Sequence, residues 1–299
     1  MSFPPTLKQL RYLAALHKTN HFGKAAEACH VTQSTLSAGI QEIESLLGAQ
    51  LVERTKRSVM FTSIGNEVVR RAQGILNDVD DLTDMAEAAK DPLRGTIRMG
   101  VIPTIAPYLL PKIIPMISKH LPHLDLYLRE DKSAELCDLM RAGDLDIVML
   151  ALPFECGNVH KMPLFADRFV AAYPKGEAPG TQISTDDLDE SKLLLLDEGH
   201  CLRDHALSAC QLLGQNAKRE LANTSLATIL PMVAAGRGMT LLPGMAIDAG
   251  ITNNIDVDIA TFKDTTPTRM IGLVWRATNP REATFEALGA AIKNSAISV

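Results

Sequence analysis

Two cysteines nine positions apart, Cys201 and Cys210, are the residues of this sequence best suited to covalent chemistry. Cys201 stands where a helix is expected to begin. The free N–H groups and the positive dipole end of a helix N-terminus favour a thiolate over a thiol. His200 and Arg203 add positive or hydrogen-bond-donating groups beside it. The sequence therefore predicts a nucleophilic sulfur at Cys201, whereas Cys210 lies in an apolar stretch and is expected to be buried and less reactive.

The spacing of these two sulfurs predicts a conformational switch. If the segment is one continuous helix, the nine residues separate Cys201 from Cys210 by a rise of roughly 13 Å. A disulfide requires Cα atoms within about 7 Å of each other. Joining the pair therefore requires this helix to unwind or to shift.

The other three cysteines have no predicted chemistry. Cys29 and Cys137 lie on apolar helical stripes and are expected to be small buried residues. Cys156 is expected in a loop and receives no role. The chain begins without a basic and then apolar leader, and it has no apolar run long enough to span a bilayer. A cytoplasmic location, no membrane contact and reduced cysteines are therefore expected.

The cysteine pair falls within a segment in which strands and helices alternate, after a predicted hinge at residues 91–95. This alternation predicts α/β layers with parallel strands. Strands are expected at residues 96–102, 124–128, 146–152, 168–173, 193–196, 239–242 and 270–275, and helices around residues 109–117, 134–142, 203–213, 224–235 and 280–294.

The N-terminal residues predict three short helices, from 7 to about 17, from 22 to 29 and from 33 to about 47. Thr32 is the expected N-cap of the third helix. That helix is expected to bury Leu36, Ile40, Ile43 and Leu47. Its other face carries short or amide side chains suited to hydrogen bonds with base edges in a major groove. These are Gln33, Ser34, Thr35, Ser37 and Gln41.

Residues 51–61 predict a β-hairpin with a basic tip, followed by a helix capped by Thr62 or Ser63. Arg54, Lys56 and Arg57 would lie beside the phosphate backbone as a wing. An ordinary three-helix bundle with a charged loop is the alternative for these elements. Together, the short turn, the polar third helix and the basic hairpin favour a DNA-binding domain.

Residues 64–90 carry apolar residues at alternating steps of four and three. Such a heptad seam is typical of a coiled coil with a partner chain rather than of a helix packed on its own domain. The sequence therefore predicts a dimer that contacts two half-sites. The seam residues are Val68, Ala72, Ile75, Val79, Leu82, Ala86 and Ala89.

Charge is divided unevenly along the 299 residues, which is a length sufficient for two domains. Residues 1–74 hold nine Lys/Arg and five acidic residues, which leaves 21 basic and 30 acidic residues for the remainder. This division predicts a polyanion-binding head on an acidic body. The sequence contains no metal-ligand cluster, dinucleotide-binding glycine pattern, phosphate-binding loop or hydrolase motif, so no cofactor and no metal are expected.

The stretch 22–61, with Thr35-Leu36-Ser37, Leu51-Val52-Glu53-Arg54 and then Thr62-Ser63-Ile64-Gly65, resembles the winged helix-turn-helix of LysR-type regulators. Ser34 stands where many relatives have proline. The resemblance covers the whole chain and implies an α+β multi-domain fold. It implies a DNA-binding domain (1–62), a linker helix for dimerisation (63–91) and a regulatory domain (92–299). The last would resemble a periplasmic binding protein with two subdomains, about 96–165 with 268–299, and about 166–267.

Residues 197–204 together with Cys210, and residues 102–111, resemble the peroxide-sensing OxyR branch of that family. The resemblance implies that peroxide oxidises Cys201 to a sulfenic acid and that Cys210 resolves it to a disulfide. Ser133 stands where relatives often have threonine. The implied peroxide pocket consists of Thr104, Ser133, His200, Asp204 and Arg269.

The implied function is that of a transcriptional activator of the oxidative-stress response, not an enzyme. Its implied partners are double-stranded promoter DNA, hydrogen peroxide, RNA polymerase and further copies of the chain, as a dimer through the linker helix and as a tetramer. Two alternatives are a LysR-type regulator with a small organic effector and a thiol peroxidase with a DNA-binding head. A third, a solute-binding transport component, is disfavoured because no signal sequence is evident.

Overall fold

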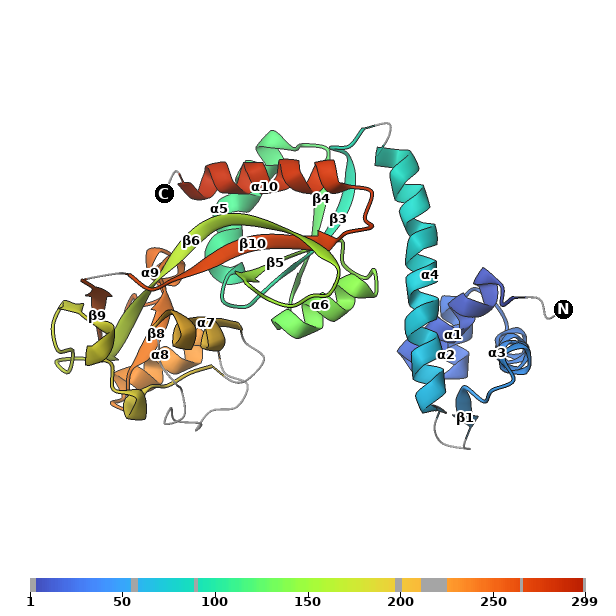
Figure 1. The fold of residues 1–299 in the computed structure, drawn as a ribbon, viewed down its shortest axis with the longest axis horizontal. Helices are drawn as coiled ribbons and strands as arrows, with labels where there is room; N and C mark the ends of the chain where they lie inside the picture. The colour runs from blue at the N-terminus through green and yellow to red at the C-terminus, as the bar shows by residue number, and fades with distance from the viewer. Residues whose placement is uncertain are drawn as a thin grey trace. The chain divides into compact units, whose positions relative to one another are not determined.

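The computed structural model describes residues 4–54, 59–88, 91–196, 201–210, 225–263 and 266–297. The chain forms two compact units, residues 1–87 and residues 88–299 (Figure 1). Among the described residues, every helix is too short or too polar to cross a lipid bilayer.

The first unit contains the three predicted short helices, α1 (Leu7–Thr19), α2 (Phe22–Ala28) and α3 (Gln33–Leu47). Thr32 caps α3, because its side chain accepts a hydrogen bond from the backbone N–H of Thr35. The predicted burial of Leu36, Ile40 and Ile43 is confirmed. Burial of Leu47 is wrong: this side chain is 42% exposed, because α3 ends there, before the left-handed Gly48.

The predicted hairpin is also present. Strand β1 (Val52–Arg54) pairs antiparallel with β2 (Val59–Phe61). Helix α4 (Ser63–Ala88) follows, and Thr62 is its cap, since its hydroxyl accepts from the N–H of Gly65. A Cβ at Gly65 would collide with the carbonyl oxygen of Leu51, so only glycine permits this close approach of α4 to the wing.

The prediction that the linker helix does not pack on its own domain is wrong for part of its length. The first half of α4 packs into the core of the first unit through Val69, Ala72 and Leu76. Seam residues Ile75 and Leu82 are 47% and 61% exposed. One face of α4 therefore packs into the core of the first unit, while the neighbouring face exposes apolar side chains to solvent.

The second unit begins with β3 (Gly95–Val101), α5 (Ala106–His120), β4 (Leu124–Glu130), α6 (Ser133–Arg141) and β5 (Ile147–Leu152). Long strand β6 (Val159–Pro174) leads to β7 (Gln182–Ile183), two 3-10 turns (Thr185–Asp187 and Glu190–Lys192) and α7 (Cys201–Ala209). The chain continues through α8 (Leu226–Ala234), β8 (Thr240–Pro243), α9 (Gly244–Asp248), β9 (Val257–Phe262), β10 (Thr268–Arg276) and α10 (Glu282–Ile297).

The sheet of this unit is mixed, which corrects the expectation of parallel strands. The pairs β3–β4 and β3–β5 are parallel, whereas β10 runs antiparallel to both β5 and β6. Strand β6 extends well beyond the predicted residues 168–173. Its first part pairs with β10 and its last part with β8 and β9. Strands β6 and β10 therefore cross between two halves of the unit as a two-stranded hinge.

Some short elements were missed or misassigned. Strands β7 and β9 and helix α9 were not predicted, because six residues or fewer carry too little periodicity. The predicted strand at residues 193–196 forms only an isolated bridge between Leu193 and Met239.

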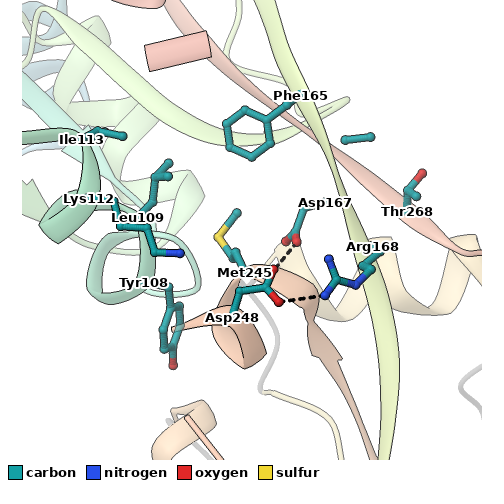
Figure 2. A pocket seen from close by; sticks show the side chains of 11 residues that line it. Tyr108, Leu109, Lys112, Ile113, Phe165, Asp167, Arg168, Met245, Asp248 and Thr268 are labelled. Carbon is teal, nitrogen blue, oxygen red and sulfur yellow. Dashed lines mark hydrogen bonds and ion pairs between the residues drawn. The ribbon is translucent and has the colours of Figure 1, made fainter. Parts of the chain in front are cut away.

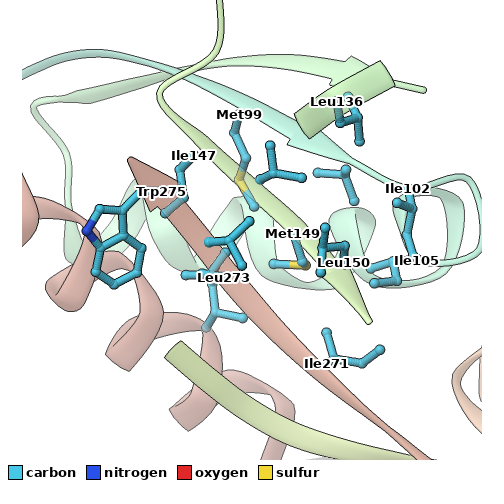
Figure 3. Packing of buried hydrophobic residues seen from close by; sticks show 14 of the residues in the cluster. Met99, Ile102, Ile105, Leu136, Ile147, Met149, Leu150, Ile271, Leu273 and Trp275 are labelled. Carbon is cyan, nitrogen blue, oxygen red and sulfur yellow. The ribbon is translucent and has the colours of Figure 1, made fainter. Parts of the chain in front are cut away.

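Two hydrophobic clusters form the core of the unit. The first cluster lies among β3, β4, β5, β10, α5, α6 and α10, and includes Met99, Met149 and Leu273 (Figure 3). Helix α10 lies on one side of this sheet and α6 on the other (Figure 1). The second cluster surrounds the end of β6, with β8, α8 and most of α7.

Candidate functional site

Arg269 is a fully buried cation at the crossing of the hinge strands, with a side-chain exposure of 0%. Its position in β10 is directly opposite Asp167 of β6. Nε donates to Asp167 Oδ2 at 3.0 Å, while Nη1 and Nη2 donate to the hydroxyl and the carbonyl of Thr104 at 2.8 and 3.0 Å. The planar guanidinium thereby ties both hinge strands to the loop before α5.

Asp167 compensates this buried charge. Its side chain is 3% exposed, and Oδ1 accepts a further hydrogen bond from the backbone N–H of Met245, at 3.0 Å (Figure 2). A buried ion pair is retained at low cost only when its remaining hydrogen-bonding groups are satisfied. These three residues, Arg269, Asp167 and Thr104, are called the arginine network below.

Ser133 supplies a buried hydroxyl that the described protein atoms leave unsatisfied. It is the first residue of α6, is 1% exposed, and its Oγ has no hydrogen-bond partner. A buried, unpaired hydroxyl is costly unless a water or a polar ligand satisfies it. This residue therefore fits a site for a small hydrogen-bonding molecule.

Cys201 and Cys210 are both free thiols at the two ends of α7. Cys210 remains in the helical register, because its N–H donates to the carbonyl of Ala206. The continuous helix on which the predicted separation depends is thus confirmed, and ideal helical geometry gives a rise of roughly 13 Å between the two residues. Cys201, 4% exposed, belongs to the first hydrophobic cluster, whereas Cys210, 2% exposed, belongs to the second.

The predicted low reactivity of Cys210 has a physical cause in this burial. Removal from solvent raises the pKa of the Cys210 thiol to about 12, so the sulfur stays protonated at neutral pH. Helix α7 packs against β5 and β10, and Cys201 lies in the same hydrophobic cluster as residues of both strands. Ile102 and Ile105, which flank Thr104, lie in the same cluster as Cys201.

His205 is a site residue that sequence reasoning missed. Its ring is half-buried and donates to the backbone carbonyl of Ala151, in β5. Desolvation and, to a smaller extent, the charge of Arg269 lower its pKa, while Asp204 acts in the opposite direction. Its position one helical turn after Cys201 was the available signal.

The predicted pocket residue Asp204 is not part of the arginine network. Asp204 is exposed on α7. His200 lies outside the described residues. The structure thus joins Thr104 directly to Arg269, places Cys201 on the adjacent cluster and buries Ser133 at the start of α6.

Cys137 and Cys156 depart from the expectation that all five cysteines are thiols. A disulfide joins them, with 5.2 Å between their Cα atoms. Burial of Cys137 is confirmed, but Cys156 is equally buried, at 1% exposed. No local pattern indicated this pair, because the two residues are 19 positions apart and meet only when β5 packs beside α6. Cys29, predicted to be buried, is partly exposed, because α2 ends there.

On α3, the predicted base-reading residues face solvent. Gln33, Ser34, Thr35 and Gln41 are exposed and Ser37 is half-buried. Arg54 is the last residue of β1. Lys56 and Arg57 lie outside the described residues.

Both units match protein families over most of their length. Residues 7–66 match the bacterial regulatory helix-turn-helix protein, lysR family, and residues 90–296 match the LysR substrate binding domain. The fold and these matches define the class: the chain belongs to the LysR family of transcriptional regulators. Within that family it falls in the OxyR branch, on the following similarities.

OxyR of Escherichia coli K12, a DNA-binding transcriptional dual regulator, is 39% identical over 96% of this chain and 94% of its own. EstR of Acinetobacter baylyi, another regulator, is 39% identical over 96% of both chains. A full-length OxyR variant from Pseudomonas aeruginosa superposes with a TM-score of 0.79 at 35% identity, covering 97% of this chain and 95% of that one. A hydrogen peroxide-bound OxyR variant from Corynebacterium glutamicum gives a TM-score of 0.67 at 31% identity, covering 100% and 94%.

Proposed function

We propose that this protein is a DNA-binding transcriptional regulator switched by hydrogen peroxide through Cys201 and Cys210. The observation that carries the proposal is that α7 holds these two free thiols at opposite ends, one in each hydrophobic cluster. Hydrogen peroxide is the proposed oxidant because one relative is a hydrogen peroxide-inducible genes activator and one solved OxyR variant is hydrogen peroxide-bound. A disulfide between Cys201 and Cys210 is incompatible with the helix, so oxidation must rebuild the contact between the two halves.

The chemistry has two balanced steps. The Cys201 thiolate attacks one peroxide oxygen, the O–O bond breaks, and the leaving hydroxide takes a proton to become water, which leaves a sulfenic acid. The Cys210 sulfur then attacks the sulfenic sulfur, a disulfide forms, and a second water leaves. In this proposal the predicted pocket residues orient the peroxide by hydrogen bonds; they are Thr104, Ser133, His200, Asp204 and Arg269.

The two steps are tested by mass spectrometry of the protein after brief exposure to peroxide. We expect a Cys201–Cys210 peptide in the wild type, and a dimedone-reactive sulfenic acid at Cys201 in Cys210→Ser. Cys29→Ser serves as the control and should retain the disulfide. Unmodified Cys201 under conditions that alter promoter binding would refute the peroxide proposal and leave the DNA-binding assignment intact.

The number of peroxide molecules that each chain consumes distinguishes a regulator from a thiol peroxidase. Burial of Cys210 and the need to rebuild α7 favour one oxidation per reduction cycle. Steady consumption of peroxide with a dithiol reductant, many equivalents per chain, would favour the peroxidase.

The output we propose is binding to double-stranded promoter DNA. Its base contacts come from Gln33, Ser34, Thr35, Ser37 and Gln41, and Arg54, Lys56 and Arg57 of the wing contact phosphates. The exposed α4 seam forms the dimer, which assembles into a tetramer and contacts RNA polymerase. A cytoplasmic location follows from this function, since promoter DNA lies there.

A further inference from the structure

The first residues of the wing are held by one carboxylate of helix α3. Glu44, in the last turn of α3, is half-buried. Its Oε1 accepts from the backbone N–H groups of Leu51 and Val52, at 2.8 and 3.0 Å. Leu51 and Val52 are 0% and 1% exposed, so water cannot replace the carboxylate at either N–H group. Glu44 therefore fastens the wing to the helix that carries the predicted base-reading residues.

The wing needs an anchor because its own hairpin is short. Strands β1 and β2 have three residues each and form a two-stranded sheet, which is marginally stable by itself. On the side of α4, the Thr62 hydroxyl donates to the carbonyl of Gln50 at 2.9 Å, and the Thr62 N–H donates to the carbonyl of Leu51 at 3.0 Å. The base of the wing is thus held between α3 and α4.

The anchor lies next to both predicted kinds of DNA contact. Gln41 and Glu44 line one side of an open groove, and Gln50 and Val52 line the other side. The hydrogen bonds of Glu44 therefore connect α3 to the strand across this groove. Arg54 is the last residue of β1, two positions after Val52. The direction of the strand at Val52 consequently determines where the backbone of Arg54 lies relative to α3.

We propose that Glu44 is a positioning residue for DNA binding, whose carboxylate fixes the direction of the wing so that its basic residues meet the phosphate backbone while α3 reads the bases. This role rests on the proposed contact between the wing and phosphate, and it includes no contact of Glu44 with DNA. A carboxylate that acted only by its charge would repel phosphate, and its removal would strengthen binding. Loss of the anchor should weaken binding instead.

Two substitutions separate the reach of the side chain from its charge. Glu44→Asp keeps the charge but is one methylene shorter and cannot reach both N–H groups. Glu44→Gln loses the charge but keeps an oxygen acceptor at the same distance. We expect Glu44→Asp to bind DNA about ten-fold more weakly than the wild type, and Glu44→Gln to bind within about two-fold of it. Glu42→Asp, the same change at an exposed position of α3, is the matched control and should bind normally.

Fluorescence anisotropy of the full-length protein in reductant measures these affinities, below the thermal unfolding of every variant. The two probes are a duplex that the wild type selects from a random-sequence pool and an unselected duplex of the same length. Because the wing contacts phosphates, Glu44→Asp should lose the same factor on both probes, and its affinity should depend less steeply on salt. A loss confined to the selected duplex, wild-type affinity in Glu44→Asp, or an equal loss in Glu44→Gln would overturn the proposal.

Replacement of Arg54, Lys56 and Arg57 by alanine tests whether Glu44 acts through the wing. If it does, Glu44→Asp should cause little further loss of affinity in this background, because the two effects are not additive. Additive losses would overturn the role of Glu44 and leave the proposed phosphate contact intact. Unchanged affinity and salt dependence in the alanine variant itself would refute the phosphate contact, and the role of Glu44 with it.

Discussion

Burial has opposite electrostatic consequences at different single residues of this protein. Arg269 is buried and charged, and it depends on Asp167 and Thr104 for compensation. Cys210 is buried and neutral, since desolvation keeps its proton in place. His205 lies between these cases, because it is half-buried beside Arg269 and its neutral form is favoured. The buried charge of Arg269 therefore disfavours a second positive charge on the nearby His205 ring.

This arrangement predicts how stability depends on pH. Because the pKa of folded His205 lies below its ordinary value of about 6.5, the unfolded chain takes up a proton first as the pH falls. The free energy of unfolding should decrease as the pH falls from about 7 through the ordinary histidine value, and level off below the folded pKa. Urea unfolding followed at several pH values measures this slope.

The matched variants are His205→Asn and His123→Asn, the latter at an exposed position. We expect His205→Asn to reduce the slope as the pH falls below about 7, and His123→Asn to retain it. A slope that is unchanged in His205→Asn would contradict this assignment of the pH dependence.

At the scale of elements, the Cys137–Cys156 disulfide fastens α6 to the segment after β5. Helix α6 begins at Ser133, one turn before Cys137, so the crosslink holds the element that presents the unsatisfied hydroxyl. Strand β5 in turn provides the carbonyl that His205 contacts. The crosslink therefore holds α6 to the segment that follows β5, the strand against which α7 packs.

Loss of this crosslink should destabilise the second unit. Closing a loop of 19 residues restricts the unfolded chain by about 3 kcal/mol in the chain-entropy account. Cys137→Ala combined with Cys156→Ala should lower the free energy of unfolding by about that amount, as measured in urea without reductant. Cys29→Ala is the control. Unfolding curves of the wild type that coincide with and without a strong reductant would count against the disulfide.

At the scale of the whole molecule, two adjacent faces of α4 have different roles: one is buried in the first unit and the other is exposed. Val69 and Leu76 complete the core of the first unit, while Ile75 and Leu82 remain exposed as an apolar seam. A second copy of the chain can bury that seam and set the spacing between two DNA-binding heads.

The seam predicts a test of assembly. Leu82→Glu should shift the protein toward the monomer and weaken binding to a two-half-site DNA by more than about ten-fold, because a charge would enter the seam. Sedimentation equilibrium and DNA titration report the two effects. Asp78→Glu, an exposed change on the same helix, is the control. A dimer of unaltered strength in Leu82→Glu would exclude this face as the interface.

Local signals in the sequence predicted most of the helices and several strands. The cap at Thr32, the apolar spacing of Leu36, Ile40 and Ile43, and the turn before α3 act over a few residues, and they were sufficient for the DNA-binding helix. The motifs around Cys201 likewise predicted a helix start and a separated thiol pair. Such features depend on backbone hydrogen bonds and periodicity that neighbouring residues alone determine.

Only the tertiary structure decided which distant residues meet. The antiparallel hinge pairs Arg269 with Asp167 across 102 residues and brings Thr104 to the same guanidinium. It also joins Cys137 to Cys156 and places the His205 ring against β5. Burial and charge compensation depend on residues that are close in space but distant along the chain. No local pattern in the sequence could therefore show which charged and polar groups surround the predicted thiols.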